Sequence, residues 1–242
     1  MKKMFLFMFI IVLVTSCMDN NDTYNDNTEV SIATVENPDS ATQFYLRLDN
    51  NIRLYCSDSE LMNYRPKDGQ RIIANYRILT SKSDTSYYQY DIQLIDVYEV
   101  LTKDVLNIQP EQQDSIGNDV ISIRNMWIGS DYLNVEFNYP GYNKIHFINL
   151  IWDSSKTYDD AKLHYEFRHN ANNDDPTNSK WGMASFDLSY LKLTNFVDSI
   201  NIVVHTKEFT KDETYELTYK PNPLMWLSSQ KMTLKKTSDK LE

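Results

Sequence analysis

Apolar and polar residues alternate along most of this chain, and a period of two predicts β-strands rather than helices. A hairpin around a turn at residues 49–51 is predicted by five alternating apolar positions: Phe44, Leu46, Leu48, Ile52 and Leu54. A tight-turn sequence at residues 66–69 and strand-like runs at 71–78 and 88–100 continue the pattern. Four or five short strands over about 70 residues predict a small barrel.

Alternation resumes after the polar stretch 109–114, which has the composition of an inter-domain linker. Six alternating segments follow, at residues 121–123, 133–137, 145–149, 163–167, 200–204 and 215–219. About seven strands in about 120 residues, with a short helix around Phe186 to Leu193, predict a β-sandwich. We therefore expect an all-β protein with a barrel over residues 37–110 and a sandwich over residues 117–242.

The first seventeen residues follow a different pattern, in which a positive start and an apolar run precede a cysteine. Lys2 and Lys3 come before apolar residues 5–14 and a small-residue site that ends at Cys17. This resembles a bacterial lipoprotein signal peptide, and an ordinary secretory signal is the alternative. In lipoproteins the cysteine carries fatty acyl chains such as palmitate, so Cys17 is the predicted lipidation site and residues 1–17 the signal. The apolar run is shorter than the about 20 residues that span a bilayer.

Residues 18–36 are rich in Asn and Asp and predict a flexible acidic tether. Asp19, Asp22 and Asp26 suggest calcium ligands, but the segment lacks the central glycine and terminal glutamate of an EF-hand. An acidic stretch after a lipidated cysteine resembles the surface-export signals of Bacteroidetes-type lipoproteins. We expect a lipid-anchored protein of the outer membrane, and both the periplasmic and the cell-surface side stay open.

Acidic residues outnumber basic ones, with 34 Asp and Glu against 24 Lys and Arg and a net charge of -10. Loss of Lys2 and Lys3 with the signal makes the mature charge -12. Such a surface repels phosphate backbones, so nucleic acid is excluded as a partner. Cys56 is then the one remaining thiol. We expect it to be a small buried apolar residue, because no base or cluster of cations adjoins it.

Motifs for common chemistries, such as GxSxG, HExxH, CxxC and a Gly-rich phosphate loop, are absent from the sequence. Four histidines are present: His146, His164, His169 and His205. His164 and Glu166 share one face of a predicted strand, which favours a polar solvent face over a metal or acid-base site. We therefore expect no catalytic residue, no metal and no cofactor.

A polar loop follows the predicted strand at 163–167, and it contains Asn172, Asn173, Asp174 and Asp175. Carboxylate and amide oxygens of this kind are calcium ligands in many extracellular β modules. The same residues form turns, and a turn before Pro176 is the favoured interpretation. An enzyme would require His169 and either Asp174 or Asp175 to converge on a pocket.

Aromatic residues are a further candidate, because exposed rings stack on sugars or peptides. The candidates for such a platform are Tyr87, Tyr88, Tyr90, Trp127, Trp152, Trp181 and Trp226. Most of the tryptophans have apolar neighbours in predicted strands, which favours core positions for them.

The segments QFYLRLDNNIRLYCSDS, YRPKDGQRIIANYRIL, YDIQLIDVYEVLTKDV and MWIGSDYLNVEFNY, with the later LHYEFRHNANNDDP and MASFDLSYL, resemble the NigD-like lipoproteins of Bacteroides and relatives. This resemblance covers nearly the whole mature chain. It implies an N-terminal OB-type barrel and a C-terminal immunoglobulin-like β-sandwich. It also implies a link to bacteriocin immunity, through the family name, and no established catalytic or ligand residues.

These observations together predict a lipid-anchored, non-enzymatic binding or assembly module of the cell envelope. The expected partner is another envelope protein or a secreted toxin, and a cationic toxin would bind an acidic patch by complementary charge. The alternative is an extracellular glycan-binding or glycan-processing accessory lipoprotein, which would carry an exposed row of aromatic residues.

Overall fold

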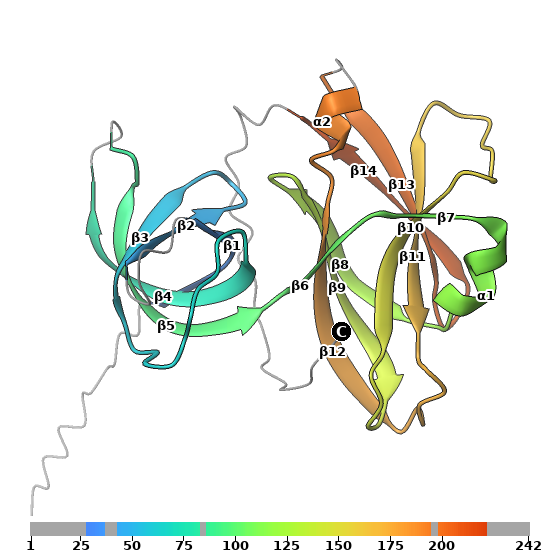
Figure 1. Cartoon of the computed structure of the whole chain (residues 1–242), viewed down its shortest axis with the longest axis horizontal. Coiled ribbons are helices and arrows are strands. Elements are labelled where there is room, and N and C mark those ends of the chain that lie inside the picture. The colour runs from blue at the N-terminus through green and yellow to red at the C-terminus, as the bar shows by residue number, and fades with distance from the viewer. Residues whose placement is uncertain (1–27, 37–42, 83–85, 195–197, 222–242) are drawn as a thin grey trace, which may run out of the picture.

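The computed structural model describes residues 28–36, 43–82, 86–194 and 198–221 of the chain. Fourteen strands and three short helical turns occupy these ranges, which confirms the all-β prediction. Figure 1 shows a closed barrel on the N-terminal side and a sandwich of two sheets after it. No helix in the described ranges has the length and apolar character needed to cross a membrane.

Five strands close the barrel in the order β1-β2-β3-β5-β4. They are β1 (Thr28–Glu36), β2 (Phe44–Leu48), β3 (Arg53–Ser59), β4 (Arg71–Ser81) and β5 (Tyr90–Glu99). The predicted hairpin is confirmed, because β2 and β3 pair antiparallel around Asn51, whose φ is 65°. A parallel pair of β3 and β5 then allows β4 and β1 to close the barrel. This order is the OB-type barrel of the prediction.

The alternating apolar residues of these strands point into the barrel and form its core. Cys56 is one of them and is fully buried, which confirms its predicted structural role. Burial raises the pKa of the Cys56 thiol to about 12, so the thiolate is scarce at neutral pH.

The sandwich contains a four-stranded sheet in the order β6-β12-β9-β8 and a five-stranded sheet in the order β14-β13-β11-β10-β7. The four-stranded sheet consists of β6 (Leu101–Asp104), β8 (Ser122–Gly129), β9 (Tyr132–Gly141) and β12 (Asn178–Asp187). The five-stranded sheet consists of β7 (Leu106–Ile108), β10 (Phe147–Asp153), β11 (Leu163–Asn170), β13 (Ile200–Lys207) and β14 (Asp212–Tyr219). Apolar side chains of both sheets pack face to face between them.

Three domain boundaries differ from the prediction. The barrel begins at β1, inside the range 18–36 predicted as tether, because Ala33 and Val35 are buried in the barrel core and β2 and β4 hydrogen-bond to the two sides of the strand. The sandwich begins at β6, inside the predicted barrel range 37–110. The predicted linker at 109–114 belongs to the sandwich, where it forms η1 (Pro110–Gln112) and α1 (Gln113–Ile116).

The predicted helix around 186–193 is shorter, since β12 extends to Asp187 and α2 covers Leu191–Thr194.

An apolar cluster joins the barrel to the sandwich. Ile32 and Ile73 from the barrel pack with Val100 and with Met183 of β12. Val30, Tyr98, Trp127 and Trp181 adjoin this cluster. The core interpretation is therefore confirmed for Trp127 and Trp181, which lie at the contact between the two domains.

A buried arginine connects the same two domains. The guanidinium of Arg71 donates to both carboxylate oxygens of Asp49, at 2.6 and 3.1 Å, and to Thr34 at 3.1 Å within the barrel. It also donates to Asn134 of β9 at 3.0 Å and stacks on the Tyr132 ring at 4.2 Å. Because a buried charge needs several partners, this network fixes the barrel against the sandwich.

Candidate functional site

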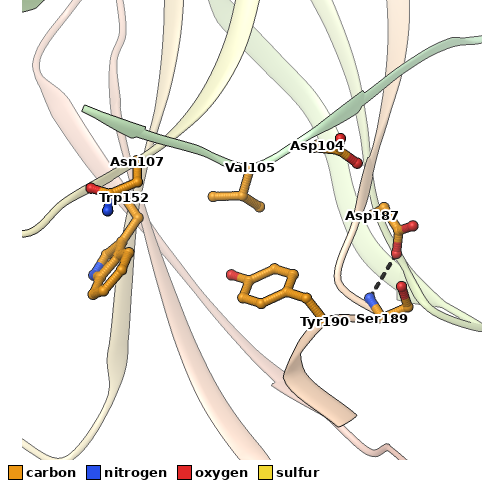
Figure 2. Close-up of a pocket in the computed structure, with 7 residues that line it drawn as sticks. All are labelled: Asp104, Val105, Asn107, Trp152, Asp187, Ser189 and Tyr190. Atoms are coloured by element: carbon orange, nitrogen blue, oxygen red, sulfur yellow. Dashed lines mark hydrogen bonds between the residues drawn. The ribbon is translucent and has the colours of Figure 1, made fainter. Parts of the chain in front are cut away.

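A pocket of about 340 Å³ opens where the chain passes from one sheet of the sandwich to the other. The passage is short, because β6 ends at Asp104 in one sheet and β7 begins at Leu106 in the opposite one. Figure 2 shows the side chains that surround the pocket: Asp104, Val105, Asn107, Trp152, Asp187, Ser189 and Tyr190. Its volume is in the range of small-ligand sites.

Two aromatic rings border the pocket on either side of the space below Val105 (Figure 2). Trp152 of β10 is 42% exposed, which separates it from the partly buried Trp127 and Trp181. Tyr190, between β12 and α2, is 39% exposed, and its hydroxyl hydrogen-bonds the hydroxyl of Tyr165 in the core. Tyr190 is therefore held in place while part of its ring faces solvent.

Two carboxylates lie at the other end of the pocket. Asp104 and Asp187 are register partners in the parallel pair of β6 and β12, so their side chains leave the sheet on the same face. Asp187 accepts a hydrogen bond of 2.7 Å from the Ser189 amide. Asp104 is exposed, and within the described ranges no salt bridge neutralises it. The neighbouring Lys103 lies within 3.5 Å of Asn149 instead, and burial lowers its pKa.

The structure brings His169 and Asp174 together through His146, a combination that an enzyme would need. His146 Nδ1 lies 2.7 Å from His169 Nε2, and His146 Nε2 lies 3.1 Å from Asp174 Oδ2. Both histidines are at most 1% exposed, and His169 Nδ1 contacts the Val120 carbonyl oxygen at 3.0 Å. The hydrogen-bond partners of these residues lie within the protein, and none of the residues lines the pocket. Their contacts connect separate loops of the sandwich.

The polar loop at residues 171–175 forms the predicted turn. Asn172 and Asn173 have φ values of 53° and 54°, a conformation that asparagine tolerates well. Burial alone would raise the pKa of Asp174, but hydrogen bonds from the Tyr142 amide and from His146 hold that pKa well below its usual range. Its carboxylate is thus already used within the protein. Among the described residues no group of three potential ligands is arranged to hold a metal ion.

The other two histidines form a second pair on the outer face of the five-stranded sheet. His164 Nδ1 lies 2.9 Å from His205 Nε2, and His164 Nε2 lies 2.8 Å from Asp160 Oδ1. Tyr158 stacks on His164 with ring centroids 3.6 Å apart. Burial lowers the pKa of His205, and the hydrogen bond to His164 lowers that of Asp160. Glu166 lies on the same polar face as predicted, where it accepts hydrogen bonds from Arg168.

A cluster of four tyrosines lies on the outer face of the barrel. Tyr45 of β2 packs against Tyr55, Tyr87 and Tyr88, with ring centroids 5.1 to 5.8 Å apart. Tyr87 is 54% exposed, and the Arg53 guanidinium lies 4.6 Å from its ring centroid. Tyr87 and Tyr88 were both candidates from the sequence, and they contribute to one aromatic surface.

Other predicted residues have different locations. Tyr90 packs against the barrel core and does not join the tyrosine cluster. Cys17, the predicted lipidation site, lies outside the described residues, as do Trp226 and the aspartates at 19, 22 and 26. Sequence reasoning missed Asp104, Asp187 and Tyr190, because no local motif signals a pocket formed by three separate segments.

Comparison with known families is informative over both domains. The NigD-like N-terminal OB domain matches residues 32–100, and the NigD-like C-terminal beta sandwich domain matches residues 104–219. A search of curated proteins finds no match.

Several solved structures are similar to the chain. A protein from Parabacteroides distasonis described as toxin-related is 30% identical, with a TM-score of 0.68, and the match covers 81% of this chain and 96% of that one. A protein of unknown function from Bacteroides vulgatus is 28% identical, with a TM-score of 0.72 and coverage of 85% and 96%. A NigD-like immunity protein from Bacteroides caccae shares the fold at 18% identity, with a TM-score of 0.61 and coverage of 81% and 97%. With the family domains matched in order over both halves, this chain belongs to the NigD-like family.

Proposed function

We propose that this protein is a lipid-anchored, non-enzymatic binding module of the cell envelope, attached to the outer membrane through Cys17, and that it protects its cell from a secreted toxin. The observation that carries the binding role is the pocket between Trp152 and the carboxylates of Asp104 and Asp187. A concave site that combines aromatic walls with a few convergent polar groups is typical of binding sites, which favours a binding role.

The connection between the domains supports a binding role as well. Val100 is buried in the apolar cluster between the two domains and directly precedes β6, so this contact helps to fix the strand that carries Asp104 into the pocket. Preformed sites lose less entropy on binding than sites that must first be ordered. The histidine networks do not compete with this interpretation, because their nitrogens already contact one another and nearby carboxylates.

A toxin as partner is supported by charge and by the relatives. The mature chain has a predicted charge of -12, which attracts cationic proteins over long distances. One structural relative is described as toxin-related and another as an immunity protein.

A killing experiment tests this proposal. The full chain, Cys17→Ala and Trp152→Ala would each be expressed in a Bacteroides strain that bacteriocin-containing supernatants of related strains kill. We expect the wild type to raise survival and both variants to lose that protection. Phe209→Ala removes an aromatic ring that is 59% exposed in the turn between β13 and β14, and it should protect like the wild type. Killing that is the same with and without the wild-type protein would rule out the immunity role.

Protease treatment of intact cells locates the protein. Degradation in intact cells would place it on the cell surface, and degradation only after the outer membrane is opened would place it in the periplasm. Release of Cys17→Ala into the soluble fraction is the expected sign of a lipid anchor. Retention of that variant in the membrane would contradict the anchor.

A second candidate function is glycan binding, and the tyrosine cluster of the barrel favours it. Four rings on one outer face form the kind of aromatic surface on which sugar rings stack. Affinity electrophoresis of the full chain in gels that contain starch, xylan or mannan tests this function. Retardation that Tyr87→Ala abolishes and Tyr142→Ala does not would support it, since Tyr142 is an exposed tyrosine of the sandwich. Equal mobility in all gels would exclude binding of these three glycans.

A further inference from the structure

We propose that the pocket at the β6–β7 passage receives a cationic side chain, arginine in preference to lysine, from a basic polypeptide. This inference rests on the proposed binding function and names the chemistry of the group that is bound. Asp104 and Asp187 would receive the positive charge, while Trp152 and Tyr190 would contact the rest of the residue.

The charge of the pocket carries the first step. Asp104 and Asp187 are neighbours in register, and like charges that face each other across a strand pair repel. Lys103 on the same strand points to Asn149, and Lys192 after Tyr190 binds Asp131. These two lysines are therefore engaged elsewhere, and a cation from outside would relieve the repulsion between the two carboxylates.

The shape of the pocket carries the second step. In Figure 2 the Tyr190 ring lies between Trp152 and the two carboxylates, with Val105 above it. The aliphatic part of a long side chain can lie along Val105 and Tyr190 while its end reaches the carboxylates. A planar guanidinium also suits this site, because it donates several hydrogen bonds in a fixed fork and stacks on aromatic faces.

The walls of the pocket are held by contacts within the protein. Asp187 is fixed by the Ser189 amide, and Tyr190 is fixed through its hydroxyl by Tyr165, which is 1% exposed. The positions of a carboxylate and an aromatic ring are thus set before a ligand arrives. A neutral sugar would also stack on Trp152, but it would leave the repulsion of the two carboxylates uncompensated.

The experiment compares ligands that differ from tri-arginine in charge, in shape or in both. The full chain, purified in detergent and labelled with 5-fluorotryptophan, would be titrated with tri-arginine, tri-lysine and tri-citrulline amides and with maltotriose. Fluorine NMR resolves the tryptophans, and Trp152→Phe assigns the pocket signal. Citrulline keeps the shape of arginine and lacks its charge. We expect tri-arginine to shift the Trp152 signal, with tri-lysine weaker and tri-citrulline at least about tenfold weaker.

Matched variants separate the pocket from the general acidity of the chain. Asp104→Asn with Asp187→Asn should weaken tri-arginine binding by about tenfold, and the amide oxygen introduced at position 187 still accepts from Ser189. Asp175→Asn with Asp212→Asn makes the same change of charge at exposed positions. The control position Asp175 lies before the start of β12, whereas the pocket residue Asp187 lies at the other end of that strand. The control pair should bind within about twofold of the wild type. If the double variant folds poorly, Asp104→Asn alone replaces it in the titration, because this change alters only an exposed side chain.

Three results would overturn the inference. They are equal binding of tri-citrulline and tri-arginine, equal losses in the pocket and control variants, and a Trp152 shift with maltotriose alone. Protection in the killing experiment without tri-arginine binding would overturn this inference and leave the immunity role standing. Tri-arginine binding in the pocket without protection in the killing experiment would overturn the immunity role and leave this inference standing.

Discussion

The imidazole rings of His146 and His169 meet inside the sandwich, with Nδ1 of the first 2.7 Å from Nε2 of the second. His169 Nδ1 faces the Val120 carbonyl oxygen, so this nitrogen carries the proton and His169 Nε2 accepts from His146. His146 Nε2 faces the Asp174 carboxylate. The pair thus connects the loop at 171–175 to the turn before β10.

Burial of His169 predicts a loss of stability in mild acid. Burial lowers the pKa of His169, so the folded chain keeps this ring neutral while the unfolded chain binds a proton below about pH 6.5. The stabilisation is fully present above that pH and is lost as the pH falls through the lower folded-state pKa. We expect His169 to reduce the free energy of unfolding by about 1 kcal/mol between pH 7.5 and 5.5, measured by urea denaturation.

A variant assigns this effect to the buried pair. His169→Gln should be less stable than the wild type at pH 7.5 and should depend less on pH. The pKa of His205 is also lowered by burial, so His205→Gln is the comparison at the surface pair. If His169→Gln kept the full pH dependence of the wild type, the buried ring would not be its source.

Removal of the Arg71 side chain should weaken the contact between the domains. Arg71→Met leaves the Asp49 carboxylate without its cation, and loss of one partner of a buried pair costs about 3–5 kcal/mol. Calorimetry should record a lower melting temperature and a separate transition for each domain. Arg65→Met, at an exposed arginine, should melt like the wild type. Adding Asp49→Asn to Arg71→Met should recover part of the loss, and no recovery would contradict the assignment.

Gly129 has no room for a side chain where the barrel meets the sandwich. A Cβ atom at this position would lie 2.2 Å from Asp49 Oδ2, and Asp49 is already held by Arg71 and Asn134. We expect Gly129→Ala to cost about 1–3 kcal/mol of unfolding free energy. In an Asp49→Ala background the same change should cost clearly less. Equal costs in both backgrounds would mean that Asp49 is not the obstacle.

Thiol titration tests both cysteines in one experiment. Cys56 is buried in the barrel and its pKa is raised to about 12, so a thiol reagent should not modify it in the folded protein. A lipidated Cys17 is blocked as well. We expect protein purified from cell membranes to react at no thiol when folded and at one thiol in urea. Two reactive thiols in urea would show that Cys17 is free.

The fold was predictable where alternation is strict. The hairpin of β2 and β3 follows from Phe44, Leu46 and Leu48, because each apolar residue faces the barrel core. Strand β1 is not separated from the preceding tether by the sequence pattern, since it has few apolar residues and its pairing with β4 depends on closure of the barrel. Short strands such as β6 and β7 were missed for the same reason, because their partners are distant in sequence.

The candidate site was less predictable than the fold. Trp152 follows the apolar residues Leu150 and Ile151 and is nevertheless exposed, whereas Trp181 lies between Lys180 and Gly182 and packs at the domain contact, so exposure does not follow from sequence neighbours. Asp104 and Asp187 become neighbours only through the parallel pairing of β6 and β12. His146 and His169 were treated separately, and antiparallel pairing of β10 with β11 brings them together.

The first two strands of the sandwich also have a consequence for assembly. Strand β6 borders one sheet and β7 borders the other, so a single stretch of eight residues, Leu101–Ile108, covers an edge of each. Exposed edges invite pairing between molecules. This stretch is synthesised before its partner strands β10 and β12, so each of them finds its neighbour already present when it folds. A gene fragment that begins after β7 would leave β10 and β12 as edge strands, and since these are longer than β7 and β6 we expect it to aggregate more than the full chain.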